Sequence, residues 1–231
     1  ETAIRPIKPQ KMLIVLLALL LGAGGAASVV LLRAAFHRGI NDIDTLEKRG
    51  INVYATVPLS PWQVKRNREQ RHLLPKSGGR RLPILAVAEP TDLSVEAIRS
   101  LRTSLHFAMM EAKNNILMVS GASPESGKSF TSTNLAVVVA QAGQRVLLID
   151  ADMRKGFLHR WLADDGHQGL SDMLVGNVTA EQAVRKTAIA NLDFVPRGQV
   201  PPNPSELLMH RRFADFLRWA GQNYDLVLID T

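Results

Sequence analysis

Cysteine is absent from the 231-residue sequence, and aromatic residues make up only 5% of it. The absence of cysteine excludes disulfide bonds, thiolate metal sites and a cysteine nucleophile. Tyr54 and Tyr224 are the only two tyrosines. With 46% hydrophobic and 21% charged residues, the composition excludes a disordered or fibrous chain and predicts a folded protein.

One long apolar segment lies near the start of the sequence. No charged residue occurs from Met12 to Leu32, and these roughly 21 residues would form about 31 Å of helix, enough to cross the core of a bilayer. A buried core helix and a signal peptide are the alternatives, but the run is too long for a signal peptide and no cleavage site follows it. We predict a transmembrane helix over residues 12–32, in which the small residues from Gly22 to Ser28 would allow close approach of another helix.

Two segments separate this helix from the next apolar runs. Residues 33–60 combine a charged helical stretch, Asp42 to Arg49, with a β-like run, Ile51 to Val57, and we expect a small juxtamembrane connector. Residues 61–83 hold most of the net charge of +7 and lack an apolar period, which predicts a basic flexible linker. This linker is either a solvated loop or a binding segment for anionic lipid headgroups. Nucleic-acid binding is disfavoured by the membrane anchor and the few aromatics.

A phosphate-binding loop is predicted between residues 121 and 130. Residues 116–120 (ILMVS) predict a short strand, and the residues from Lys128 onward predict a helix. The loop between them ends in Gly-Lys-Ser, as a Walker A loop does, but Ala122 replaces the first glycine of the usual pattern. The predicted nucleotide-binding residues are Gly121, Ala122, Ser123, Pro124, Glu125, Ser126, Gly127, Lys128, Ser129 and Phe130.

Each residue type in this loop suits a phosphate. We expect Gly121 to supply a tight turn and Gly127 to let backbone N–H groups approach the phosphates at the start of the helix. Lys128 should bridge the β and γ phosphates, and the Ser129 hydroxyl should bind Mg²⁺.

Two further apolar runs end in carboxylates. Residues 145–150 (RVLLID) and 224–230 (YDLVLID) predict strands buried on both faces, as in a parallel sheet. Asp150, Asp152 and Asp230 would then lie at the carboxyl ends of strands, where open α/β sheets bind ligands. The alternative for Asp150 and Asp152 is that they cap the following helix. We therefore predict an α/β fold over residues 84–231, a P-loop parallel sheet with helices on both faces, and we expect the domain to continue beyond Thr231.

The motifs GASPESGKS, VLLIDADMRKG and VLIDT resemble the Walker A, Walker A′ and Walker B motifs of bacterial tyrosine kinases of the Wzc type. These are polysaccharide copolymerase autokinases with a MinD- or ParA-like deviant Walker fold. The resemblance implies that Lys128 and Ser129 hold ATP and Mg²⁺, that Asp152 and Asp230 complete the metal shell, and that Asp150 is the base. Lys128, Asp150 and Asp152 are thus the implied catalytic residues. The segment Glu96-Ala-Ile-Arg99-Ser-Leu-Arg102 resembles the family's self-association helix, although its spacing also fits an ordinary solvated helix face.

The same resemblance implies the setting of the protein. It implies a ring-like homo-oligomer at the bacterial inner membrane, with residues 1–11 in the periplasm and the kinase domain in the cytoplasm, where ATP is found. The partners it implies are a low-molecular-weight tyrosine phosphatase, a polysaccharide export channel and a polymerase. The chain would run from the family's second transmembrane helix to the Walker B strand, and the tyrosine cluster that the family phosphorylates would lie beyond Thr231.

Two other functions are compatible with the sequence. A MinD- or ParA-like ATPase switch would share the fold, but Ser123 stands where those proteins carry a signature lysine. A scaffold that binds ATP without transferring phosphate is the second alternative. Tyrosine labelling from ATP would distinguish the kinase from both.

Overall fold

The structure is a computed structural model that describes residues 11–36, 43–72, 83–123, 126–162 and 168–231. Predictions for residues 1–10, Pro124 and Glu125 lie outside the described residues. The elements, in chain order, are α1 (Lys11–Phe36), α2 (Ile43–Glu47), α3 (Pro61–His72), α4 (Leu85–Ala88), α5 (Leu93–Met110), β1 (Ile116–Val119), α6 (Lys128–Gln141), β2 (Val146–Asp150), α7 (His159–Leu162), α8 (Leu170–Val175), α9 (Ala180–Ala183), β3 (Arg185–Lys186), β4 (Leu192–Val195), α10 (Pro204–Met209), α11 (Arg211–Asn223) and β5 (Leu226–Asp230).

The first compact unit, residues 1–53, contains α1 and α2. Helix α1 confirms the predicted helix and extends it at both ends. Its segment Lys11–Arg33 is long and apolar enough to cross a membrane, and none of it is buried within the protein. Helix α2 confirms the helical part of the connector, but residues 51–57 form no strand, so that prediction was wrong.

The second unit, Tyr54–Thr231, begins well before the predicted boundary at residue 84. Helix α3 occupies residues 61–72, where the sequence had predicted a flexible linker, while residues 73–82 lie outside the described part of the chain. The helix forms because Ser60 caps it through the Gln63 amide and Pro61 starts it, a common helix-start pair. Ser60 is buried and donates a hydrogen bond to Asp92 at 2.7 Å, and Trp62 packs against the core. Helix α3 and the residues before it back to Tyr54 are therefore part of the folded unit.

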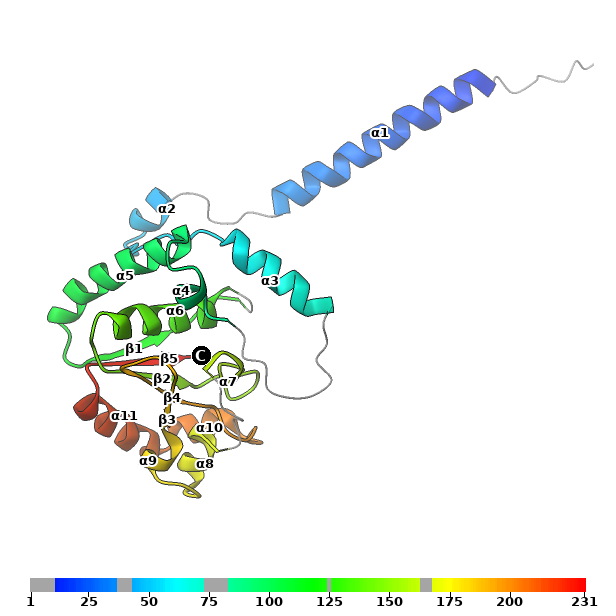
Figure 1. The fold of residues 1–231 in the computed structure, drawn as a ribbon. Coiled ribbons are helices and arrows are strands. Elements are labelled where there is room, and N and C mark those ends of the chain that lie inside the picture. The colour runs from blue at the N-terminus through cyan, green and yellow to red at the C-terminus, as the bar shows by residue number, and fades with distance from the viewer. Residues whose placement is uncertain (1–10, 37–42, 73–82, 124–125, 163–167) are drawn as a thin grey trace, which may run out of the picture. The chain divides into compact units, whose positions relative to one another are not determined.

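The sheet of this unit has the strand order β1-β5-β2-β4-β3. Strands β1, β5, β2 and β4 are parallel, as predicted, whereas the two-residue β3 pairs antiparallel with β4 at the edge. Helices cover both faces, with α4, α5 and α6 on one side and α8 to α11 on the other (Figure 1). Side chains alternate along each strand: Leu148 packs in the core under α6, and its neighbour Leu147 in the core on the opposite face. This alternation explains why the apolar runs are continuous.

Polar side chains hold the helices of the first face in place. Asp92 is the N-cap of α5 and accepts a hydrogen bond from the Ser94 amide at 2.8 Å. Asn134, buried in α6, accepts one from the Ala86 amide of α4 at 2.8 Å. These contacts fix α4 and α5 against the helix that follows the phosphate-binding loop.

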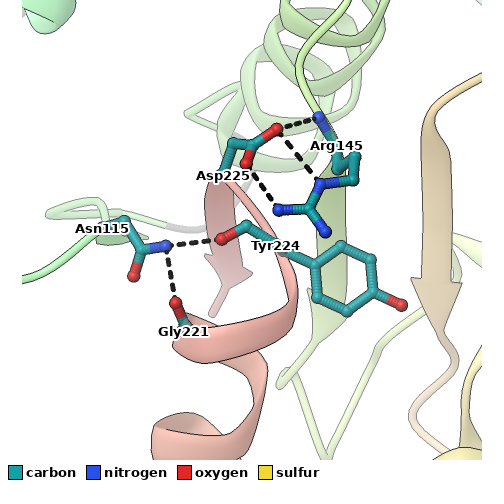
Figure 2. A network of polar contacts seen from close by, with 5 residues as sticks. All are labelled: Asn115, Arg145, Gly221, Tyr224 and Asp225. Carbon is teal, nitrogen blue, oxygen red and sulfur yellow. Dashed lines mark hydrogen bonds and ion pairs between the residues drawn. The ribbon is translucent and has the colours of Figure 1, made fainter.

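A second polar network lies at the amino ends of the strands (Figure 2). Arg145, just before β2, pairs with Asp225, just before β5, at 2.8 Å. Asn115, just before β1, donates hydrogen bonds to the carbonyls of Gly221 and Tyr224 at 3.0 and 2.7 Å. The network joins the starts of the neighbouring strands β1, β5 and β2, and it lies at the end of the sheet opposite their carboxyl ends.

Candidate active site

The phosphate-binding loop and two carboxylates lie at one edge of the sheet. Strands β1, β5 and β2 are parallel, so the loop after β1 and the last residues of β2 and β5 meet at their carboxyl ends. Asp150 and Asp230 are register partners across β2 and β5. The strands that carry the three motifs are therefore parallel neighbours, as predicted, and bring the motifs to the same edge of the sheet.

The loop closes onto the start of α6, a 14-residue helix. Gly127 is its N-cap with φ of 86°, a left-handed conformation that strains any residue with a side chain. Gly121, expected to supply the tight turn, has no positive φ; its role is close packing. A Cβ at residue 121 would lie 3.0 Å from Cγ and Cδ of Lys128 and would clash with the Ser126 hydroxyl. The glycines thus let the loop fold back along the lysine stem.

The remaining described residues of the predicted loop differ in exposure. Ala122 and Ser123 are exposed, as is Ser126. Phe130, predicted to contact nucleotide, is half-buried and packs against the core under α6. Its side chain therefore supports the helix.

Asp150 is fully buried at the end of β2. Its Oδ2 accepts a hydrogen bond from the Leu158 amide at 3.2 Å, and its Oδ1 has no partner among the described residues. A Cβ at Gly156 would lie 2.7 Å from Oδ2 and would also clash with Oδ1, so the backbone at residue 156 touches the carboxyl group. Burial, helped by the nearby charges of Asp230 and Asp152, raises the pKa of Asp150 to about 7. A carboxyl group with this pKa can exchange a proton near neutral pH.

Asp152 is half-buried, and its Oδ1 organises the turn that follows β2. It accepts hydrogen bonds from the amides of Arg154 at 3.1 Å and Lys155 at 2.8 Å. Asp152 therefore caps a turn and not the following helix, because α7 starts only at His159, so the alternative of a helix cap is wrong for this residue. Asp152 still lies close enough to raise the pKa of both Asp150 and Asp230.

Asp230 is buried at the end of β5, and its Oδ1 accepts a hydrogen bond from the Ser132 hydroxyl at 2.9 Å. Burial raises the pKa of Asp230, while hydrogen bonds from Ser129 and Ser132 and the charge of Lys128 oppose the rise. The Walker A residues Lys128 and Ser129 thus lie beside the Walker B carboxylate.

The donor set around this carboxylate fits magnesium. Among the described residues, no three His, Cys, Asp or Glu side chains form a preformed metal site. Mg²⁺ usually takes only one or two carboxylates and completes its shell with phosphate oxygens and water. Asp230 with the Ser129 hydroxyl, and Asp152 nearby, supply oxygen ligands of the required type.

Three site residues were missed by sequence reasoning. Ser132 lies one helical turn after Ser129, so helical spacing could have identified it. Gly156 is recognisable only from the close approach of its backbone to Asp150. Arg197, which follows β4, lies near enough to lower the pKa of Asp150, and no local motif marks it.

The predicted self-association residues all lie on α5. Glu96 pairs with Arg99, which also donates a hydrogen bond to the Pro90 carbonyl at 2.9 Å. The opposite side of the helix buries Ile98, as the spacing predicted. Glu96 is exposed, and Arg99 and Arg102 are partly exposed.

A family model and named relatives match the chain. The family model described as "AAA domain" matches residues 114–231. The chain is 52% identical to the "Tyrosine-protein kinase wzc" of Salmonella typhimurium over 97% of its length, and 47% identical to the "Tyrosine-protein kinase etk" of Escherichia coli K12 over 98%. It spans about a third of these proteins, 31% and 32% of their lengths.

Solved kinase domains match the fold as well as the sequence. The "BceF Tyrosine Kinase Domain" aligns with a TM-score of 0.76 at 48% identity, covering 84% of this chain and 77% of that one. The kinase domain of Escherichia coli ETK aligns with a TM-score of 0.75 at 48% identity, covering 84% and 74%. The chain therefore belongs to the family of bacterial tyrosine-protein kinases that includes Wzc, Etk and BceF.

Proposed function

We propose that this chain is the kinase part of a membrane-anchored tyrosine autokinase that controls the chain length and export of an exopolysaccharide. The observation that carries the proposal is the meeting of the Lys128 loop with Asp150 and Asp230 at one sheet edge. The reaction class comes from the names of the relatives, which are tyrosine-protein kinases 52% and 47% identical to this chain.

The reaction follows from the positions of these groups. The N-terminus of α6 and Lys128 would hold the phosphates of ATP, and Ser129, Asp152 and Asp230 would bind Mg²⁺. The bound metal would neutralise charge on the phosphates. The tyrosine oxygen then bonds to the γ phosphorus, the bond to the ADP oxygen breaks, and the phenol proton passes to Asp150. Positioning carries most of the catalysis, because phosphoryl transfer has a loose transition state.

The burial of Asp150 adds a condition to this mechanism. Its side chain has no exposed surface beneath the turn at residues 153–156. A tyrosine hydroxyl can reach this carboxyl group only if the turn moves aside or if a water molecule relays the proton. A raised pKa near 7 suits a group that must hold and release that proton.

We place the protein at the bacterial inner membrane. Helix α1 is apolar over Lys11–Arg33 and would span the bilayer, with residues 1–11 in the periplasm and the ATP site in the cytoplasm. The exposed Glu96 and the partly exposed Arg99 and Arg102 would join copies into a ring. The phosphatase, export channel and polymerase implied by the family are the proposed partners, and no nucleic acid is expected.

Phosphotyrosine formation tests the proposal. The 231-residue chain in lipid nanodiscs, supplied with ATP, Mg²⁺ and a glutamate–tyrosine copolymer, should label the copolymer. Lys128→Met should remove the label, whereas Lys113→Met, an exposed lysine at the amino end of β1, should not. Phosphate release without phosphotyrosine would favour the ATPase switch, and ATP binding alone would favour the scaffold.

A further inference from the structure

The two tyrosines of the chain differ in their exposure and in the contacts that restrain them. Tyr224 is held at both ends: its hydroxyl donates a hydrogen bond to Asp193 Oδ2 at 2.8 Å, and its carbonyl accepts one from Asn115 at 2.7 Å. Asp193 is itself buried and paired with Lys186 at 2.7 Å. The Tyr224 ring also packs edge-on against Trp219 at 6.4 Å between centroids. Figure 2 shows this tyrosine within the polar network that joins the strand starts.

The position of Tyr224 also removes it from the chemistry. It lies two residues before β5, at the amino ends of the strands, whereas the phosphate-binding loop lies at their carboxyl ends. Phosphorylating its hydroxyl would break the bond to Asp193 and bring a dianion next to a buried carboxylate, which is unfavourable. Tyr224 is therefore a structural residue.

Tyr54 has none of these restraints. Its side chain is 44% exposed, and no hydrogen bond, ion pair or ring contact links it to the described residues. It lies in residues 51–60, which form neither helix nor strand. A phosphoacceptor must bring its hydroxyl in line with the γ phosphate, and an exposed side chain on irregular backbone can do so without unfolding an element.

The chain following Tyr54 is fixed to the N-terminal end of α5. The Ser94 hydroxyl donates a hydrogen bond to the Pro58 carbonyl at 2.8 Å, and the Ser60 hydroxyl donates one to Asp92 at 2.7 Å. Pro58 is the fourth residue after Tyr54, so the tyrosine lies within about 14 Å of that anchor.

This anchor lies toward the edge that carries the phosphate-binding loop. At the C-terminal end of α5, Met110 lines one groove together with Asn115, Gln144 and Leu226, which mark the amino ends of β1, β2 and β5. Helix α5 has 18 residues, about 27 Å of helix, so its N-terminal end reaches toward the opposite, carboxyl edge. Tyr54 is thus tethered toward the nucleotide edge, and Tyr224 lies at the far one.

We propose that Tyr54 is the autophosphorylation site within these 231 residues, and that Tyr224 is not modified. The inference rests on the proposed kinase activity and names its acceptor. The Tyr54 oxygen attacks the γ phosphorus of ATP, ADP leaves, and the phenol proton is taken up by the base of the site.

Mass spectrometry of the chain in nanodiscs with ATP and Mg²⁺ tests the inference, with copolymer labelling measured in the same reaction. We expect phosphate on the peptide containing Tyr54. Tyr54→Phe should reduce self-labelling at least tenfold and leave copolymer labelling unchanged, whereas Tyr224→Phe should leave self-labelling intact. The Tyr224→Phe change keeps the ring, so it is also the matched control for losing one hydroxyl.

Three results would overturn the inference, and they separate it from the proposed function. If the copolymer is labelled but Tyr54 is not, or if Tyr54→Phe labels itself as the parent does, the kinase stands and the assignment of its acceptor fails. If neither the copolymer nor the chain is labelled, both the proposed function and this inference fail.

Discussion

Replacing Gly156 by alanine should damage the site through a single added carbon atom. That atom would lie 2.6 Å from the Asp152 carbonyl oxygen and 2.7 Å from Asp150 Oδ2, closer than real Cβ atoms come to other atoms. One of the two neighbours is backbone, so the turn at residues 153–156 must shift. Because Asp150 is buried beneath this turn, its carboxyl group must shift as well.

The size of the effect can be worked out from two opposing terms. Overpacking of this kind costs about 1–3 kcal/mol, and replacing a glycine gains about 0.4–1 kcal/mol by restricting the unfolded chain. We therefore expect Gly156→Ala to lower the free energy of unfolding by about 1–2 kcal/mol. Displacement of Asp150, the proposed base, should also lower the rate of copolymer labelling at least tenfold.

Gly143→Ala is the matched control. Gly143 has φ of 91°, and a Cβ added there would meet no atom within 4 Å, so alanine strains the backbone without touching the site. It should cost about 1 kcal/mol of stability and leave the labelling rate unchanged. Urea unfolding followed by tryptophan fluorescence measures the first quantity, since all three tryptophans lie in the second unit. A Gly156→Ala protein as stable and as active as its parent would show that the turn accepts a Cβ at this position without displacing Asp150.

Three further predictions concern side chains that support the site. Burial tends to raise the pKa of Asp92, but hydrogen bonds from Ser60 and from Ser94 at the start of α5 outweigh this effect and hold the pKa below its usual range. The stability that Asp92 contributes is then present above about pH 4 and is lost as the pH falls through the lower pKa of the folded state. Asp92→Ala should therefore lower the free energy of unfolding by about 1 kcal/mol at pH 7 and by progressively less below pH 4, as measured by urea titration. Asn134→Ala should lower the unfolding free energy by about 2 kcal/mol, because a buried amide of α4 loses its acceptor; Asn134→Asp, which keeps an acceptor, should cost less. Ser132→Ala removes a hydrogen bond from Asp230 and should raise the Mg²⁺ concentration for half-maximal labelling about tenfold; an unchanged Mg²⁺ curve would exclude a supporting role for this hydroxyl.

The sheet could be predicted from sequence because its central strands are buried on both faces. Continuous apolar runs ending in Asp150 and Asp230 identify β2 and β5, and Gly-Lys-Ser after a third run identifies the loop. Their parallel order then brings the carboxylates together without further information. The short β3 could not be predicted, since two residues carry no periodic signal.

The errors arose where tertiary contacts decide local structure. Helix α3 is highly charged and has no apolar stripe, yet the Ser60-Pro61 start and the packing of Trp62 hold it against the domain. Residues 51–57 have β-forming side chains but no neighbouring strand among the described residues to pair with, so they remain irregular. Asp150 is buried beneath a turn that can approach it closely because Gly156 has no side chain. Hydrophobic periodicity in the sequence does not predict such a contact.

The alternation of side chains along the strands determines which mutations should influence one another. Leu147 and Leu148 are consecutive in the chain, but they belong to separate cores on opposite faces and share no packing neighbours there. Leu148 and Leu228 are far apart in the chain, yet they are cross-strand partners in one core. Truncating the adjacent pair should therefore have additive energetic costs, whereas truncating the distant pair should not. Epistasis in this domain should follow the two faces of the sheet, with little regard to distance along the sequence.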